Sequence, residues 1–483
     1  MGNTDDAGTT EGTGEVAEEF ERRLGASDSV LWDIEKDPVL RSTITAVALL
    51  DRVPDWERLQ RRLRHGSQLV PRLRQRVVFP PLRVAAPRWI DDPRFDLDYH
   101  LRRVRAPQAP AGADPLRVAL DVAQTLSLAP FDRARPLWEF TLVEGLPGDQ
   151  AVFVQKVHHT VTDGVGGVRL ALMLVDDAAD APEPEAVDHR RPGPAPSAGS
   201  LFAGGLTETV RDAARNATRV PGAAAGALNG FVREPLGSIR DVARLGGSVS
   251  RLLRPVTEPC SPIMRERSLA RRFEAFEVPF DDLRAAGHAV GGHANDAFLA
   301  AVVGGLADYH RHHEVPLREL RFTMPINVRH EGDPLGGNRF VPARFSVPAY
   351  VRDPEARMAV VGRVAHEWRT EPSLGLTEPL ATVLDRLPIS VTTALFGGML
   401  KGVDAGVTNV PGVPVRHYLA GAEVLREWAF APPSGAALSV ALLSHVGVGC
   451  VGLTIDTASV PDPEVLAACV QRSFEETLAV GRG

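Results

Sequence analysis

The chain has 483 residues, of which 44% are hydrophobic and 24% charged, a balance typical of globular proteins rather than of disordered or fibrous ones. The formal net charge of −7 gives no basic signature for nucleic-acid binding, and the length predicts two large domains or three small ones. Cys260, Cys450 and Cys469 are widely spaced and odd in number, so a disulfide framework is not expected, which fits a reducing cytoplasm.

Residues 1–26 are acidic and polar and lack the basic and then apolar order of a secretory signal. They are predicted to form a disordered tail. Over residues 27–180, strand-like runs such as AVFVQKV alternate with helix-like runs such as PLRVALDVAQTLSL. This alternation indicates a first α/β domain.

Residues 181–260 are predicted to be a linker with bridging helices, because their start is rich in proline and charge and an Ala/Gly/Arg-rich stretch follows. Within them, residues 235–255 have the pattern of a basic amphipathic helix, with Arg240, Arg244, Arg251 and Arg254 on one side. An ordinary surface helix that packs its apolar face on the protein has this pattern. A helix that contacts anionic lipid headgroups has it as well.

Residues 261–483 are predicted to form a second α/β domain. Its stretch from Trp428 to Ile455 contains no Asp, Glu, Lys or Arg and is long enough to span a bilayer. Two prolines and several glycines interrupt it, so it is better interpreted as containing two buried strands joined near Gly447 and Gly449.

The segment AVFVQKVHHTVTDGVGG holds the strongest chemical signal in the chain. Side chains alternate along a strand, so His158 and His159 should point to opposite faces, which argues against a two-histidine metal site. The glycines that follow do not complete a dinucleotide-binding fingerprint, because Arg169 occupies the third glycine position. A histidine followed by Asp163 at a strand-to-helix turn suits general-base chemistry, although packing histidines and a helix-capping aspartate would give the same pattern.

An acyl-enzyme nucleophile has no evident candidate, because the chain contains no Gly-x-Ser-x-Gly elbow and no cysteine in a reactive setting. Direct transfer to a hydroxyl needs only a base, a polarised acyl carbonyl and correct positioning.

HHTVTDG (158–164) resembles the HHxxxDG motif of the bacterial wax ester synthase/acyl-CoA:diacylglycerol acyltransferase family, a motif that peptide-condensation domains also carry. Further segments resemble family motifs in the same order, and the resemblance covers the chain from about Ser27 to the C-terminus. These segments are SDSVLWDIEKDP (27–38), RPLWE (135–139), NDAFLA (295–300), MPINVR (324–329), GGNRF (336–340) and TNVPG (408–412).

The resemblance implies an α/β fold of two chloramphenicol-acetyltransferase-like domains, residues 27–180 and 261–483, with the active-site channel at their interface. It implies that His159 is the general base, that His158 supports the site, and that Asp163 and Gly164 shape the turn, with Arg329 as a partner of Asp163. The residues expected to line the substrate channel are Pro136, Leu137, Trp138, Asn295, Asp296, Asn409, Pro411 and Gly412.

Ordinary structural roles remain open for several of these residues: core packing for Trp138, helix capping for Asn295, and a turn for Pro411 and Gly412. The chain also departs from the family at Val413, where proline is frequent, at Arg41-Ser42, where Met-His is expected, and at Ser444-His445, where Ser-Tyr is common. These departures bear on acyl-chain and acceptor preference more than on the chemistry.

The expected activity is transfer of a long-chain acyl group from acyl-CoA to a lipid hydroxyl, of diacylglycerol or of a fatty alcohol, without a metal or redox cofactor. The expected location is the cytoplasm, with peripheral contact to an anionic membrane or lipid-droplet surface left open. Two alternatives remain at this stage: a natural-product acyltransferase that uses a carrier-bound donor, and a lipid-binding protein without turnover.

Overall fold

The computed structural model describes residues 22–83, 85–108, 114–183, 196–207, 211, 258–327, 340–369 and 389–482. Several predictions fall outside these ranges and stay predictions. They are the tail up to residue 21, most of the linker, the arginine-rich segment 235–255, and Arg329.

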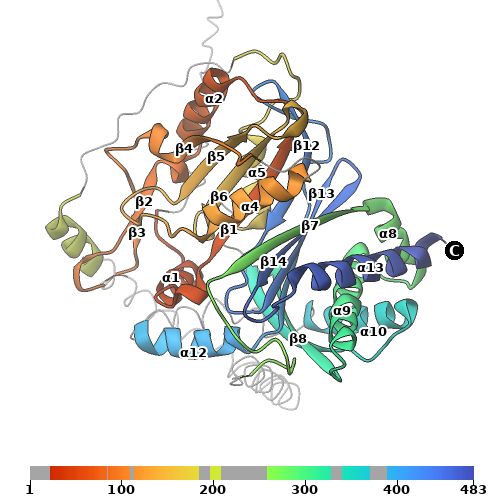
Figure 1. Cartoon of the computed structure of the whole chain (residues 1–483). Helices are drawn as coiled ribbons and strands as arrows, with labels where there is room; N and C mark the ends of the chain where they lie inside the picture. Colours follow the sequence, from red (N-terminus) through yellow and green to blue (C-terminus); the bar gives the residue numbers. More distant parts are fainter. Residues whose placement is uncertain are drawn as a thin grey trace, which may run out of the picture.

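Two six-stranded sheets form the framework of the molecule (Figure 1). The strands are β1 (Thr43–Leu50), β2 (Gln75–Val78), β3 (Arg88–Asp91), β4 (Leu101–Arg105), β5 (Trp138–Glu144), β6 (Ala151–His158), β7 (Arg271–Pro279), β8 (Glu319–Asn327), β9 (Phe340–Pro348), β10 (Ala405–Val410), β11 (Tyr418–Leu419), β12 (Ala422–Phe430), β13 (Leu438–His445) and β14 (Val448–Asp456). The first sheet has the order β11-β12-β1-β6-β5-β4 and the second the order β7-β14-β13-β10-β8-β9, while β2 and β3 pair separately.

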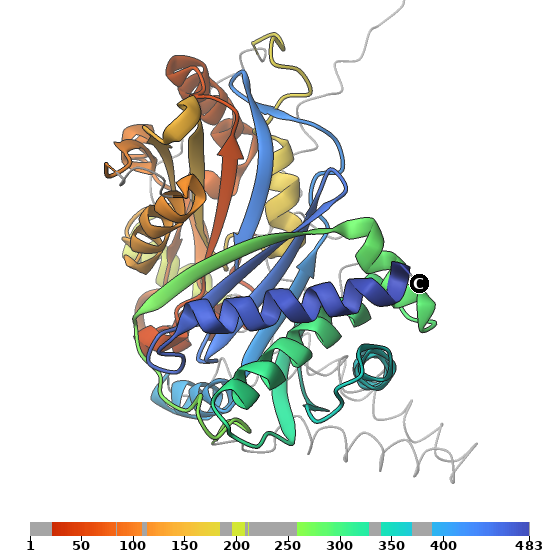
Figure 2. The same cartoon turned by 45° about the vertical axis from the view of Figure 1, so that its right-hand side comes forward.

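Helices cover both sheets. They are α1 (Ala26–Ile34), α2 (Trp56–Leu69), α3 (Leu97–His100), α4 (Pro115–Leu128), α5 (Gly164–Leu172), α8 (Phe280–Ala289), α9 (Ala294–His312), α10 (Pro354–Arg369), α12 (Ile389–Lys401) and α13 (Pro463–Arg482), with short 3-10 turns at Pro38–Leu40, Pro71–Leu73, Pro81–Arg83 and Pro147–Asp149. Figure 2 shows α13 and α9 lying side by side against the second sheet, with α10 beyond them. The predicted arrangement of two α/β domains is therefore present, while the bounds 27–180 and 261–483 stay predictions.

The strands β5 and β6 are buried along almost their whole length, because hydrophobic cores pack on both faces of the first sheet. Phe140 and Phe153 belong to one core, and Val152 and Val154 belong to the other. Runs that are apolar on both faces are typical of such central strands. The rigid pair β5–β6 carries the HHxxxDG segment at its end.

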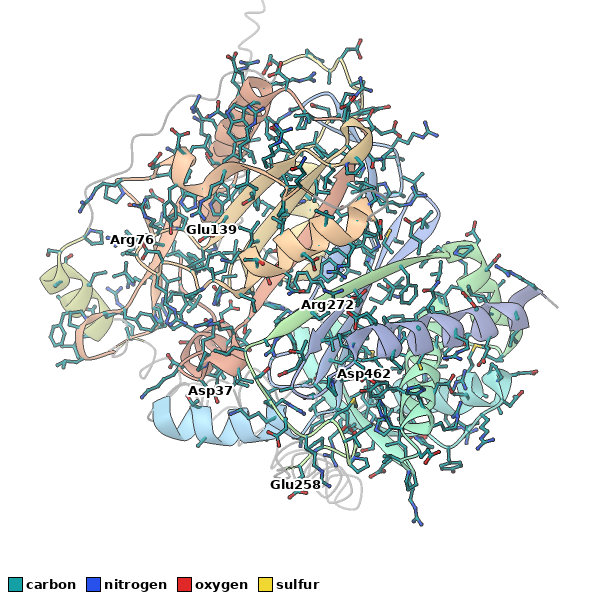
Figure 3. The ribbon with its side chains drawn as sticks, in the orientation of Figure 1. Asp37, Arg76, Glu139, Glu258, Arg272 and Asp462 are labelled. Carbon is teal, nitrogen blue, oxygen red and sulfur yellow. The ribbon has the colours of Figure 1, made fainter. Side chains whose placement is uncertain are left out.

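The second core of this sheet continues into the C-terminal half of the chain, where Phe273, Trp428 and Cys450 join it. Polar contacts cross the same boundary. Arg272 of β7 lies 3.1 Å from Asp121 of α4, across the boundary, and 3.1 Å from Glu464 of α13 in its own half; Figure 3 labels Arg272 at this junction. The two halves are thus packed on each other through α4 and β7.

A second connection joins α1 to α12. The side chains of Asp37, just after α1, and Lys401, the last residue of α12, form an ion pair, and Asp37 is labelled beside α12 in Figure 3. Apolar residues of α1 pack beneath this pair with Leu40 and Leu400. The opening segment of the chain is therefore attached to the C-terminal half.

One segment crosses from the C-terminal half into the first sheet. The strands β11 and β12 complete that sheet, where β12 runs antiparallel to β1 with Thr45 opposite Phe430 and Leu50 opposite Val424. The strand β13 then returns to the second sheet beside β10. A division of the chain at residue 261 therefore separates the second sheet from most of the first, but residues 418–430 belong structurally to the first.

The strand pair predicted within Trp428–Ile455 is confirmed. The strands β13 and β14 are antiparallel, with Leu438 opposite Ile455 and His445 opposite Val448. Gly447 has a φ of 77° at the turn between them, a conformation that glycine adopts without a Cβ penalty. Among the described residues, no helix is both long and apolar enough to cross a membrane.

Candidate active site

The backbone around the two histidines is fixed on both sides. The His158 N–H donates to the carbonyl of Leu137 (3.0 Å), and the His159 N–H donates to the carbonyl of Ser42 (2.8 Å). The Val161 N–H then turns back to the carbonyl of His158 at 2.9 Å. The histidines therefore lie where the sheet ends and the chain turns toward α5.

The turn ends in a capped helix. Asp163 is the N-cap residue of α5, and its Oδ1 accepts a hydrogen bond from the Gly166 N–H at 2.8 Å. Only 6% of Asp163 is exposed. This side chain satisfies one of the amide groups that a helix start leaves without a partner, and it fixes the direction in which α5 leaves the sheet.

Gly164, the first residue of α5, packs directly on the TNVPG segment. A Cβ built on Gly164 would lie 2.8 Å from Cγ2 of Val410, closer than real Cβ atoms approach a neighbour. A larger residue at this position would therefore force Val410 to move. The contact brings together two motifs that are about 250 positions apart in the sequence, roughly the length of a large domain.

Both ring nitrogens of His158 lie close to polar atoms of the protein. Nε2 lies 2.9 Å from Oε1 of Glu35, and Nδ1 lies 2.8 Å from Oγ1 of Thr160 and accepts the Thr160 N–H at 3.1 Å. The ring is 2% exposed and packs against Trp32 and Phe131. A carboxylate can only accept, so Nε2 carries the proton and Nδ1 is the acceptor.

Glu35 was not singled out from the sequence, yet it is the centre of this cluster. Its Oε1 accepts the Ser42 N–H at 2.6 Å, and its Oε2 accepts from Arg133 at 2.7 Å. Burial alone would raise the pKa of the Glu35 carboxyl, but His158, the Ser42 amide and Arg133 together hold that pKa below its ordinary value. Glu35 is therefore charged at neutral pH.

A cavity of about 350 Å³ opens beside this pair. Its wall combines two aromatic rings with the basic side chains of Lys36, Arg41 and Arg133, and Arg133 stacks on Trp32 with its guanidinium carbon 4.3 Å from the ring centroid. Arg41 is one of the departures from the family pattern. The full lining is Trp32, Asp33, Glu35, Lys36, Arg41, Thr43, Pro130, Phe131, Arg133 and His158.

His159 is half-buried and follows directly after β6. The hydrogen bond of its backbone to Ser42 extends the β1–β6 ladder by one position. Because side chains alternate along a ladder, the imidazole of His159 belongs to the face opposite His158. The two histidines therefore have different surroundings.

The Pro136-Leu137-Trp138 segment lies inside the N-terminal core. All three residues are buried, and the Trp138 ring stacks on His100 with centroids 4.6 Å apart while its Nε1 donates to the Leu73 carbonyl at 2.8 Å. The Leu137 carbonyl holds the His158 backbone. These are contacts of core residues that position β6, and contact with substrate stays a prediction for them.

Asn295 and Asp296 lie in the first turn of α9. Oδ2 of Asp296 accepts the His293 N–H at 2.8 Å, so it caps the start of the helix. Asn295 is half-buried, with its Nδ2 3.9 Å from Sδ of Met324, which belongs to the MPINVR segment. These two motifs meet in the C-terminal half.

The TNVPG segment ends β10. Asn409 and Pro411 are exposed, and the Gly412 N–H donates to Oγ of Ser444 at 3.2 Å. The structure thus joins this segment to α5 through Val410 and to β13 through Gly412. It does not bring Asn409 or Pro411 into a described contact with the histidines.

Comparison with known proteins identifies the family. Residues 24–298 match the model of the wax ester synthase/diacylglycerol acyltransferase catalytic domain, and residues 336–477 match the model of the C-terminal domain of the same family. The chain belongs to this family. Wax ester synthase/diacylglycerol acyltransferases are acyltransferases, so the general class of the reaction follows from membership.

A relative from Mycobacterium tuberculosis strain H37Rv, named as a candidate diacylglycerol O-acyltransferase, is 38% identical over 470 residues, which is 95% of this chain and 92% of that protein. The solved wax ester synthase/diacylglycerol acyltransferase from Marinobacter aquaeolei VT8 has a TM-score of 0.61 at 19% identity, over 95% of this chain and all of that one.

The first condensation domain of the calcium-dependent antibiotic synthetase has a TM-score of 0.59 at 16% identity, over 96% of both chains. Both structural likenesses show the fold. The expected two-domain, chloramphenicol-acetyltransferase-like architecture is confirmed.

Proposed function

We propose that this acyltransferase moves a long-chain acyl group from acyl-CoA to the hydroxyl of a lipid, with diacylglycerol as the preferred acceptor and a fatty alcohol as the second. Family membership supports acyl transfer, and the 38% identical M. tuberculosis relative carries the name of a diacylglycerol O-acyltransferase. The proposed donor and acceptor need no cofactor beyond the acyl-CoA itself.

The observation that carries the mechanism is that both ring nitrogens of His158 lie against polar groups of the protein. A general base needs a ring nitrogen whose lone pair can reach the substrate proton. In His158, Glu35 fixes the proton on Nε2, and Thr160 occupies the lone pair of Nδ1. His158 is therefore a positioning residue, and the base is assigned to His159 on the opposite face.

In the proposed reaction, His159 takes the proton of the acceptor hydroxyl as its oxygen attacks the thioester carbonyl. The resulting tetrahedral oxyanion collapses, the carbon–sulfur bond breaks, and the coenzyme A thiolate takes the proton from the His159 imidazolium. The role proposed for Asp163 and Gly164 is to hold the turn, through the cap of α5 and its contact with Val410.

The test is turnover of labelled palmitoyl-CoA by purified protein with diacylglycerol, hexadecanol, glycerol and amines offered separately. We expect triacylglycerol as the main product. The variant His159→Ala should lose about 10²–10⁴ of turnover, the usual contribution of positioned proton transfer, whereas His158→Ala should lose less. His288→Ala, on the exposed surface of α8, is the matched control and should be unchanged.

Wild-type rates in folded His159→Ala would overturn the mechanism. Faster transfer from a carrier-loaded acyl group than from acyl-CoA would assign the protein to natural-product assembly. Binding of lipid without any labelled product would show a binding protein.

A further inference from the structure

Three buried titratable side chains meet where the chain crosses between the sheets. His417 precedes β11, Glu427 lies on β12, and His445 is the last residue of β13. One ring nitrogen of each histidine and one carboxylate oxygen of Glu427 lie within 4.8 Å of one another. The three residues are 4%, 9% and 2% exposed, so water does not compensate them as it would on a surface.

Both histidines donate one ring N–H to a backbone carbonyl. Nδ1 of His417 lies 3.1 Å from the Val415 carbonyl, and Nε2 of His445 lies 3.1 Å from the Val424 carbonyl. A carbonyl can only accept, so the second nitrogen of each ring carries a lone pair. Metal-binding histidines show this arrangement, in which a carbonyl fixes the tautomer and the orientation of the ring.

The lone pair of His445 is unused. Its Nδ1 is buried, and among the described residues it has no hydrogen-bond partner. A buried polar atom left without a partner is unfavourable, so this nitrogen is available to a bound ligand.

Glu427 lacks a counter-ion. Its Oε1 accepts a hydrogen bond from Gln155 at 3.3 Å, and within the described part of the chain no lysine or arginine pairs with it. Burial raises the pKa of the Glu427 carboxyl to about 7 and lowers the pKa of His445 to about 4. The first shift reflects the cost of a buried negative charge, and a bound cation would remove that cost.

We propose that His417, Glu427 and His445 bind one divalent transition-metal ion, with zinc as the best fit. Two imidazoles and one carboxylate form a known zinc ligand set, whereas calcium and magnesium take oxygen ligands. In a tetrahedral site, ligand atoms at about 2.0–2.1 Å from a common zinc ion lie about 3.4 Å apart, so any of these separations that approaches 4.8 Å must shorten when the ion binds. The chain supplies three ligands, and a water molecule enclosed with the ion would be the fourth.

The role of this ion is structural. It links the crossover strand β12 of the first sheet to the end of β13 in the second sheet, and it binds the loop before β11 to both. His445 stands where the family commonly has tyrosine, so the site is a property of this chain and of relatives that share the histidine. The sequence did not reveal it because the ligands have no short spacing.

The experiment uses untagged full-length protein, with metal measured by plasma mass spectrometry as purified and after chelation and addition of zinc. We expect one zinc ion per chain, a higher Tm with zinc than without it, and near-complete loss of metal in Glu427→Gln and in His445→Tyr. Cobalt added to the metal-free protein should give the strong visible absorption of a four-coordinate site.

The matched control is the second histidine–carboxylate cluster, His312, His313 and Asp462, which is partly exposed. The double variant His312→Ala/His313→Ala should keep its zinc. Equal metal content in His445→Tyr and wild type, or loss only in the control variant, would overturn the proposal.

Absence of zinc from the wild type, both as purified and after zinc is added, would overturn it as well. If a ligand variant fails to fold, the test uses the wild type only. Its Tm must fall on chelation and recover when zinc is added. None of these measurements uses acyl transfer, so they do not depend on the proposed function.

Discussion

Glu35 holds a charge inside the protein, and its stabilising effect should therefore depend on pH. Its pKa is depressed in the folded state, so its contribution is present above the ordinary value of 4.5 and is lost as the pH falls through the folded value. We expect Glu35→Gln to be less stable at pH 7 by about 1.5–3 kcal/mol, the range for hydrogen bonds to charged groups, and the difference to shrink below pH 4.5.

Urea denaturation of both proteins between pH 3.5 and 7 measures this difference, within the range in which the fold persists. Glu464→Gln is the control, because Glu464 also pairs with an arginine but is largely exposed. A stability gap that is constant with pH would show that the Glu35 charge contributes nothing to folding. Turnover should fall less in Glu35→Gln than in His159→Ala, since Glu35 acts only through His158.

Among single residues, the sequence motif singled out His158, His159 and Asp163, because they lie within a few positions of one another. It missed Glu35, which meets His158 only after more than a hundred residues have folded between them. It left Trp138 open between core packing and a substrate-lining role; the structure places its ring among His100, Phe95 and Phe140, and contact with substrate stays a prediction. A tryptophan in a strand gives no local indication of which face of the sheet is core.

Asp163, at the start of α5, can stabilise the protein as a helix cap and through its charge, and two variants separate these contributions. Asp163→Ala removes the cap and should cost about 1 kcal/mol of stability, within the 0.5–2 range measured for such caps. Asp163→Asn keeps an oxygen that can accept the Gly166 N–H, so it should retain most of that stability.

Melting and turnover of the two variants should be compared. If Asp163 also pairs with Arg329, as the family resemblance implies, Asp163→Asn will lose stability and activity through its missing charge. Equal losses of stability and activity in Asp163→Asn and Asp163→Ala would show that the charge of Asp163 matters and its capping hydrogen bond does not. A collapse of activity with melting unchanged would place Asp163 in the chemistry.

The contact between α5 and β10 predicts a specific pair effect. Gly164→Ala introduces a methyl group 2.8 Å from Cγ2 of Val410, a side chain that is branched and buried and so has little room to move. We expect a loss of about 1–3 kcal/mol, the usual cost of overpacking. Adding Val410→Ala should recover part of it in a double-mutant cycle.

If the stability changes of Gly164→Ala and Val410→Ala simply add in the double variant, the predicted contact between these residues is contradicted. The variant Gly398→Ala provides the control, because a Cβ at that helical glycine meets nothing within 4 Å. It should be neutral or slightly stabilising.

Hydrophobic patterns predicted the strands around AVFVQKV and the pair β13–β14, since each pattern is local. They did not predict that residues 418–430 join the first sheet. The pairing of β12 with β1 depends on edges that are brought together by the whole fold. A strand pattern indicates a strand but not its neighbour.

Access to lipid is a property of the whole molecule and concerns residues outside the described ranges. With a net charge of −7, the protein as a whole is repelled by anionic membranes, so a local stripe of arginines is needed to attract headgroups. We expect co-sedimentation with anionic vesicles at low salt and less at high salt, with each basic residue contributing about 1 kcal/mol.

Replacing Arg240, Arg244 and Arg251 by glutamate should weaken vesicle binding and slow turnover of vesicle-borne diacylglycerol, while a detergent-dispersed alcohol is spared. Replacing Arg52, Arg265 and Arg416, which are largely exposed, changes the net charge by the same amount and controls for it. If both triple variants co-sediment with vesicles to the same extent as the wild type, lipid access lies elsewhere.

The crossover strand also sets the order in which the protein can be made. On the ribosome, β1 emerges about 380 residues before the end of β12, which at 5–20 residues per second is a delay of about 20–80 s. Throughout that time the edge of β1 that will receive β12 has no partner, and an unpaired edge is a template for aggregation. The nascent first sheet is therefore exposed to association with other chains until its last strands arrive, and a gene fragment that ends before Tyr418 would encode a first sheet without β11 and β12.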